Sequence, residues 1–213
     1  MRRQKILLAD DHPMVLEGVA KILEEHFDIV GKVEDGRALI NAAKELKPDV
    51  VVLDISMPLL NGFEAARQLR KLIPDSKLIF LTMHADATYA NEAFEAGASA
   101  YLLKRSAASE LTKAIRTVTS GQMYLTPLLR PEDSPPLGNG SEKQVPKLKQ
   151  LTPRQREILQ LIGEGKSTKD IAAFLSISVK TVEFHKSNIM ETLAIHTTAQ
   201  LTRYAVAHGL AKL

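Results

Sequence analysis

The regular alternation of short apolar runs with helical patterns is the feature that most constrains this fold. Five runs rich in β-branched and large apolar residues lie in the first 120 residues or so, at 5–9, 28–33, 49–54, 77–83 and 100–104. Helical patterns separate them, near 14–25, 37–46, 62–72, 87–96 and 108–120. Strands that alternate with helices form a parallel sheet covered on both faces. The sequence therefore predicts an α/β domain with a flavodoxin-like, doubly wound, five-stranded parallel sheet in the order 2-1-3-4-5.

Polar residues stand where the predicted strands end. Right-handed crossovers bring the carboxyl ends of parallel strands to one edge of the sheet, and ligands bind at that edge. We therefore expect three carboxylates, a hydroxyl and an ammonium group to lie close together there. These groups belong to Asp10, Asp11, Asp54, Thr82 and Lys104.

Clustered carboxylates repel one another, so a cation must offset their charge. Oxygen ligands beside a phosphate suit Mg²⁺. With the ion bound, one carboxylate can act as a nucleophile toward a phosphoryl group, and Asp54 is the central candidate because its strand flanks the switch point. Lys104 and Thr82 are expected to hold the phosphoryl oxygens.

The first 120 residues resemble the receiver domain of two-component response regulators. The resemblance rests on ADDHP (9–13), LDISMPLLNG (53–62), LTMH (81–84) and YLLK (101–104). It implies that a sensor histidine kinase phosphorylates Asp54, that Lys104 pairs with the phosphoryl group, and that Thr82 and Tyr101 form a coupled switch whose ring turns inward. The metal ligands that it implies are Asp10 (through water), Asp11, Asp54 and the backbone carbonyl of Ser56.

A proline-rich segment follows. Residues 127–146 hold five prolines and two glycines and keep neither a helical nor a strand period, which is typical of a linker. We expect a receiver domain at 1–122, a flexible linker at 123–148 and a second domain at 149–213. Residues 147–213 contain ten Lys or Arg and five Asp or Glu, and this basic balance favours a polyanionic partner such as double-stranded DNA.

Helix-start signals recur through the basic module. Thr152 and Gln155 form a capping box, Ser167 and Asp170 open a second helix, and Ser178 and Thr197 are candidate caps for two further helices. Two short helices joined by a tight turn indicate a helix-turn-helix. In the third helix, Val182, Ile189 and Leu193 share one stripe, while polar residues and Phe184 project elsewhere. Phe184 is placed to touch a thymine methyl and Glu183 to accept from cytosine, whereas Lys180 and Lys186 suit phosphates. The alternative is that Phe184 packs on a neighbouring domain or helix.

This module resembles the four-helix DNA-binding domain of the NarL/FixJ (LuxR-type) regulators, through LTPRQREIL, GKSTKDIA, LSISVKTVEFH and NIMETL. The resemblance implies that the third helix enters the major groove and the fourth forms a homodimer on an inverted-repeat operator. Glu183 departs from the family, in which that position is often lysine. The DNA-contacting candidates are Thr152, Lys180, Thr181, Glu183, Phe184, His185, Lys186 and Ser187, and the dimer candidates are Thr198, Leu201 and Tyr204.

Several classes of site and location are excluded or disfavoured. The chain has no cysteine, so it has neither a disulfide framework nor a thiolate site. Its first apolar run is too short for a signal peptide or a spanning helix, and we expect a soluble, cytoplasmic protein without a membrane partner. The six histidines show no metal-ligand spacing, and we interpret them as surface or packing residues.

Three alternatives compete with a phosphorylated transcription regulator. A dehalogenase-type phosphatase would carry an acid two residues after its nucleophile, but Ser56 occupies that position. A flavin- or dinucleotide-binding protein would need a phosphate-cradling loop after a strand, but two aspartates follow the first strand instead. A phosphorylation-independent scaffold would not need all five edge residues. We therefore expect a protein that is not an enzyme, except that its receiver assists its own phosphoryl transfer and dephosphorylation. RNA polymerase is a further candidate partner.

Overall fold

The computed structural model describes residues 3–129 and 150–211. The chain divides into two compact units, Met1–Leu137 and Gly138–Leu213. Among the described residues, no helix has both the length and the apolar character needed to cross a membrane.

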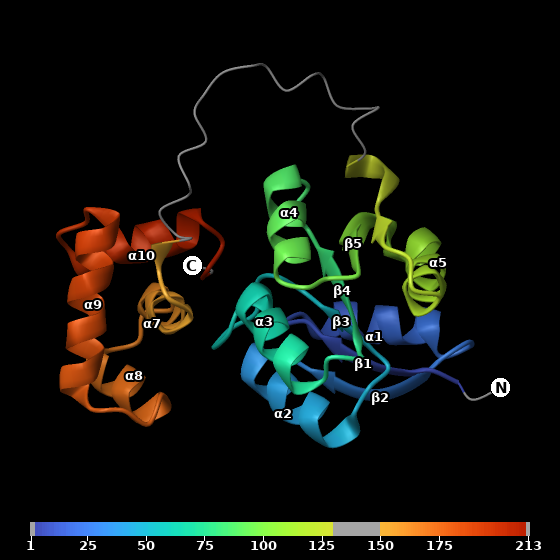
Figure 1. Cartoon of the computed structure of the whole chain (residues 1–213), viewed down its shortest axis with the longest axis horizontal. Helices are drawn as coiled ribbons and strands as arrows, with labels where there is room; N and C mark the ends of the chain where they lie inside the picture. The colour runs from blue at the N-terminus through green and yellow to red at the C-terminus, as the bar shows by residue number, and fades with distance from the viewer. Residues whose placement is uncertain (1–2, 130–149, 212–213) are drawn as a thin grey trace, which may run out of the picture. The chain divides into compact units, whose positions relative to one another are not determined.

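Strands and helices alternate through the first unit, as the sequence predicts (Figure 1). The strands are β1 (Lys5–Ala9), β2 (Asp28–Val33), β3 (Val50–Leu53), β4 (Lys77–Thr82), β5 (Ala100–Leu103) and β6 (Tyr124–Leu125). The helices are α1 (Pro13–Leu23), α2 (Gly36–Leu46), α3 (Gly62–Leu72), α4 (Ala87–Glu95) and α5 (Ala107–Thr119), with short 3₁₀ turns η1 (Lys104–Ser106) and η2 (Pro127–Leu129).

All strand pairs are parallel, and the sheet order is β2-β1-β3-β4-β5-β6. One face packs against α2, α3 and α4 and the other against α1 and α5 (Figure 1). The central strand β3 is buried along its whole length, which explains its unbroken apolar run. The pairing confirms the predicted order 2-1-3-4-5, to which β6 is added beside β5.

The sixth strand is a difference from the prediction. Tyr124–Leu125 pairs in parallel with β5, and η2 follows it, so the start of the predicted 123–148 linker is regular structure. A two-residue strand has no detectable period, and for this reason the sequence pattern did not reveal it. The remainder, 130–148, lies outside the described residues, and the linker stays a prediction there.

The described part of the second unit, residues 150–211, contains the helices α7 (Pro153–Gly163), α8 (Thr168–Phe174), α9 (Val179–Leu193) and α10 (Thr198–Ala207). All four predicted caps are confirmed. Thr152, Ser167 and Thr197 form capping boxes, and the Ser178 side chain accepts from the Thr181 backbone N–H. Packing of α10 on α7, and of α9 on α7 and α8, encloses a small core that includes Val182, Ile189 and Leu193.

Candidate functional site

Four strands of the first unit deliver polar groups to one edge of the sheet. Asp10 and Asp11 follow β1, Asp54 follows β3, Thr82 ends β4, and Lys104 directly follows β5. Asp10 and Asp54 are each about 4% exposed, although both are carboxylates. Burial of this kind is costly unless the charges are paired.

Lys104 supplies much of that pairing. Its Nζ lies 2.6 Å from Asp10 Oδ2 and 2.9 Å from Asp54 Oδ2. The second oxygen of Asp54 accepts from the Ile55 backbone N–H at 2.7 Å. Burial alone would lower the pKa of Lys104, but the charge of Asp54 and the hydrogen bonds to both aspartates outweigh it and raise that pKa. Lys104 is therefore a cation at neutral pH, placed where a phosphoryl group on Asp54 would need one.

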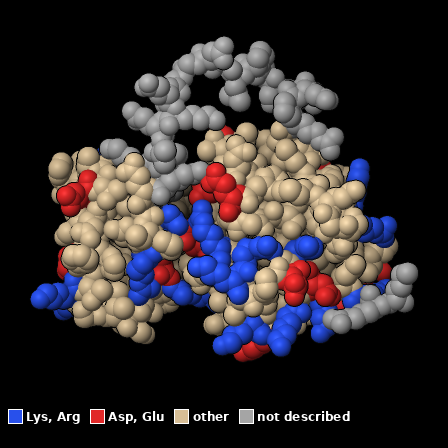
Figure 2. All heavy atoms as spheres, in the orientation of Figure 1, with Lys and Arg blue, Asp and Glu red and all other residues tan. Residues whose placement is uncertain are grey.

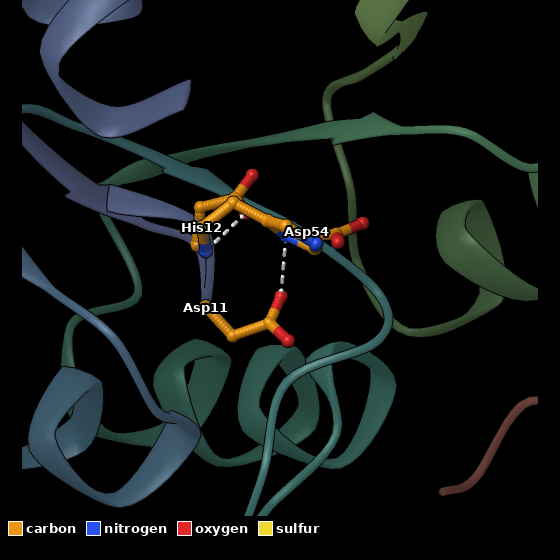
Figure 3. A group of neighbouring side chains, drawn as sticks. Asp11, His12 and Asp54 are labelled. Carbon is orange, nitrogen blue, oxygen red and sulfur yellow. Dashed lines mark hydrogen bonds and ion pairs between the residues drawn. The ribbon is translucent and has the colours of Figure 1, made fainter. Parts of the chain in front are cut away.

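His12 is a residue of this site that sequence reasoning missed. Its Nδ1 lies 3.0 Å from Asp10 Oδ1 and 2.9 Å from Asp11 Oδ1, and its backbone N–H donates to Asp10 Oδ1. Figure 3 shows Asp11 and His12 beside Asp54, turned toward one another. His12 is a surface residue, as we interpreted the histidines, with its side chain 55% exposed, but its contacts with both aspartates were not anticipated. The only available signal was its position directly after the two aspartates.

The donor set fits a hard divalent cation. Asp10, Asp11, His12 and Asp54 each offer one ligand atom, and these atoms all lie within 4.8 Å of one another. Three of the four are carboxylates, the ligands that Mg²⁺ prefers. The cluster of Asp10, Asp11 and Asp54 therefore fits a Mg²⁺ site.

The predicted switch residues lie next to this edge. Thr82 is fully buried, and its Oγ1 accepts from the His84 backbone N–H at 3.4 Å. The ring of Tyr101 is also fully buried, and its hydroxyl donates to the His84 carbonyl oxygen at 2.8 Å. Burial, followed by the negative charge of Asp54, raises the pKa of Tyr101, so the phenol stays protonated and remains a donor. The ring already lies inward here, and its inward turn on phosphorylation stays a prediction.

His84 is a second residue that the sequence analysis set aside. Its Nε2 lies 3.1 Å from Ser56 Oγ, and its ring stacks on Tyr89 with the centroids 4.3 Å apart. The contact with Ser56 joins the β3–α3 loop to the β4–α4 loop, and the stack on Tyr89 holds His84 against α4. The first contact involves the side chain of Ser56, and the proposed metal-ligating role of its backbone carbonyl stays a prediction.

In the second unit, α9 presents the predicted DNA-contacting side chains. Lys180, Glu183, Phe184 and Ser187 are exposed, while Thr181, His185 and Lys186 are half-buried. Phe184 has 63% of its surface exposed and lies beside His185, so it does not pack into the core of its own unit. The exposed ring of Phe184 is therefore available for contact with a partner outside its own unit.

Thr152 has a structural role at the start of α7. Its Oγ1 accepts from the Gln155 backbone N–H, and Gln155 Oε1 accepts from the Thr152 backbone N–H. Thr152 is exposed, so its hydroxyl can still donate to a phosphate. Figure 2 shows the Lys and Arg side chains of this unit distributed over the face in view rather than gathered in one block.

One predicted dimer contact needs correction. Leu201 is fully buried within its own unit, where α10 packs on α7, so its side chain is not available to a partner. Thr198 is exposed and Tyr204 is half-buried, with its ring stacked on His208. The helical pattern of α10 shows which residues are apolar but not which of its faces meets α7.

An acid-lined edge of a flavodoxin-like sheet, joined in one chain to a helix-turn-helix unit, defines the class of two-domain, DNA-binding response regulators. Comparison with known families agrees. The model of the response regulator receiver domain matches residues 6–116, and that of the luxR family of bacterial regulatory proteins matches residues 149–205. The chain belongs to the two-component response regulators with a LuxR-type DNA-binding domain, and is a transcription regulator rather than a classical enzyme.

Relatives align along almost the whole chain. The transcriptional regulatory protein LiaR of Bacillus subtilis is 38% identical over 94% of this chain and 96% of its own length. MctR of Rhizobium johnstonii is 35% identical over 97% and 94%. Among solved structures, RcsB of Salmonella typhimurium has a TM-score of 0.60 and 28% identity, covering 97% of this chain and all of that one. An RcsB–DNA complex has a TM-score of 0.57, with 28% identity and coverage of 97% and 99%.

Proposed function

We propose that a sensor histidine kinase transfers a phosphoryl group to Asp54, and that this modification controls homodimerisation and sequence-specific DNA binding. The observation that carries the proposal is the contact of Lys104 Nζ with Asp54 Oδ2 at 2.9 Å inside a buried acidic cluster. A scaffold would gain nothing from burying two carboxylates, those of Asp10 and Asp54, around one lysine.

In the transfer, a carboxylate oxygen of Asp54 forms a bond to phosphorus as the phosphorus–nitrogen bond of the kinase phosphohistidine breaks, and the imidazole leaves. Asp10, Asp11, Asp54 and the Ser56 carbonyl would hold Mg²⁺, which supplies charge neutralisation on the transferring group. Lys104 remains beside Asp54 and pairs with the phosphoryl oxygens, while Thr82 is the hydroxyl nearest the edge on β4. The same groups would assist the later hydrolysis.

The experiment that tests this proposal treats the full chain with Mg²⁺ and acetyl phosphate. We expect a mass increase of one phosphoryl group, formation of dimers in sedimentation velocity, and tighter binding to a duplex selected from a random-sequence pool. Phosphorylation without any change in assembly or DNA affinity would contradict the coupling. A chain that acquires no phosphoryl group would contradict the proposal itself.

Asp11→Asn is expected to weaken Mg²⁺ binding by at least about tenfold, because it removes one of three clustered anionic ligands. Isothermal titration calorimetry measures the affinity directly. Asp75→Asn, which changes an exposed carboxylate in the α3–β4 loop, is the matched control and should bind Mg²⁺ like the wild type. Equal Mg²⁺ affinities of the wild type, Asp11→Asn and Asp75→Asn would show that Asp11 is not a metal ligand.

For the second unit, we propose that α9 lies in the major groove and α10 forms the dimer contact, through Thr198 and Tyr204. The exposure of Phe184 and Lys180, together with the relatives solved with DNA, supports this arrangement. RNA polymerase would be a further partner of the DNA-bound dimer.

Two substitutions on α9 should have different signatures. Phe184→Ala is expected to cost up to about 3 kcal/mol in binding to the selected duplex, because the complex would no longer bury the apolar ring, with little change in thermal stability because the ring is exposed in the free protein. Lys180→Ala should weaken binding to all sequences alike and reduce the slope of log affinity against log salt by about one per subunit. Fluorescence anisotropy over a salt series measures both. A large fall in the melting temperature of Phe184→Ala would instead show that the ring packs inside the protein.

A further inference from the structure

The segment that leaves the receiver is bound to the strand that carries the switch residue Tyr101. The Tyr124 backbone N–H donates to the Ser99 carbonyl at 3.0 Å, and the Thr126 backbone N–H donates to the Tyr101 carbonyl at 3.0 Å. These bonds make β6 the outermost strand, beside β5. The chain then passes through η2 toward the DNA-binding unit.

One carboxylate of α5 holds two side chains of this exit segment. Glu110 Oε2 accepts from the Tyr124 hydroxyl at 3.0 Å, and Glu110 Oε1 accepts from Thr126 Oγ1 at 3.1 Å. Tyr124 is buried and Thr126 is fully buried. Hydrogen bonds to a charged group are among the stronger ones in proteins. We call Glu110, Tyr124 and Thr126 the exit clasp.

The exit clasp is connected to the phosphoacceptor edge through Tyr101. The Tyr101 hydroxyl donates to the His84 carbonyl in the β4–α4 loop, while its own carbonyl accepts from Thr126 in the exit segment. Lys104, which contacts Asp54, directly follows the same short strand and begins the turn that leads into α5. A displacement of β5 or of the β4–α4 loop must therefore either move the exit segment or break these bonds.

We propose that the exit clasp is the positioning element that transmits the state of the phosphoacceptor site to the DNA-binding unit, with Glu110 as its central residue. This inference rests on the proposed function, because it concerns how phosphorylation changes DNA affinity. Glu110 acts through β6 and does not touch the reacting atoms. The exit segment is the part of the chain that connects the receiver to the linker. A change in its position therefore changes where the linker begins.

The test compares full-length variants in two measurements, the rate of phosphorylation by acetyl phosphate and the ratio of DNA affinities with and without the phosphoryl group. The DNA is the duplex selected by the phosphorylated wild type. The principal variant is the double substitution Tyr124→Phe with Thr126→Val, which removes both hydroxyls and keeps side-chain size. Glu110→Gln is the conservative variant, because an amide can still bond to both hydroxyls. Ser109→Ala is the matched control, because its hydroxyl bonds only locally, to the Ser106 carbonyl.

In the double variant we expect the affinity ratio to fall by at least about threefold, which is within the range for coupling networks, while the phosphorylation rate stays within about twofold of wild type. Amide hydrogen exchange in 120–129 should become faster in that variant. Glu110→Gln and Ser109→Ala should keep the wild-type ratio.

A double variant with faster exchange in 120–129 and an unchanged ratio would overturn the inference and leave the proposed function intact. A phosphorylation rate that falls in parallel with the ratio would also overturn it, because the clasp would then only support the site. A wild-type chain whose DNA affinity ignores the phosphoryl group would overturn both this inference and the proposed function.

Discussion

Asp54→Asn is expected to lower phosphoryl incorporation from acetyl phosphate by at least about 100-fold, because it removes the nucleophile of a covalent mechanism. The replacement keeps the shape of a side chain that is only about 4% exposed, so the fold should be retained. The gain in DNA affinity and the formation of dimers on addition of phosphodonor should disappear with it. Mass spectrometry, sedimentation velocity and anisotropy measure the three effects on one preparation.

Asp75→Asn serves as the control for Asp54→Asn, since it removes an exposed carboxylate from the α3–β4 loop and should behave as wild type. An Asp54→Asn variant that still gains a phosphoryl group would place the acceptor elsewhere. If the same variant gains none but still responds to the phosphodonor in DNA binding, the result would favour the scaffold interpretation, in which the receiver answers to another input.

Gly62→Ala is expected to destabilise the receiver by about 2–3 kcal/mol, which would lower its melting temperature by about 10 °C. Gly62 begins α3, and a Cβ there would lie 2.2 Å from the Asp54 carbonyl oxygen and 2.9 Å from the Ile55 Cα. Both are backbone atoms, so no side-chain rotation relieves the overlap. The clash also moves the residue that carries the phosphoacceptor carboxylate, and we expect phosphorylation to slow as well.

Gly18→Ala in α1 is the matched control for this effect. A Cβ at Gly18 meets nothing within 4 Å, and the position is exposed in the middle of a helix. There the substitution should stabilise the receiver by about 0.5–1 kcal/mol. Thermal unfolding followed by circular dichroism compares the two variants. A melting temperature of Gly62→Ala at or above that of wild type would show that the α3 start can shift without cost.

Local sequence patterns were sufficient to define the elements and their caps. Alternating apolar runs and helical patterns predicted five strands and five helices of the receiver to within a few residues. Strands buried on both faces give continuous apolar runs, and helices buried on one face give a helical period, so both are visible in the local sequence. The caps Thr152, Ser167, Ser178 and Thr197 were predictable because a cap bonds to a backbone N–H two or three residues later. The convergence of Asp10, Asp54 and Lys104 followed from topology, since parallel strands end at one edge.

Contacts between distant segments became visible only in the folded chain. The bond of Ser56 to His84 spans 28 positions and that of Thr126 to Glu110 spans 16, and no local period records either of them. Leu201 looked like any apolar residue of an amphipathic helix until the packing of α10 on α7 buried it. The periodicity of a sequence shows which side chains avoid water. Which residues then contact one another depends on how the helices and strands pack. The exit clasp and the contact of His84 with Ser56 are determined by that packing.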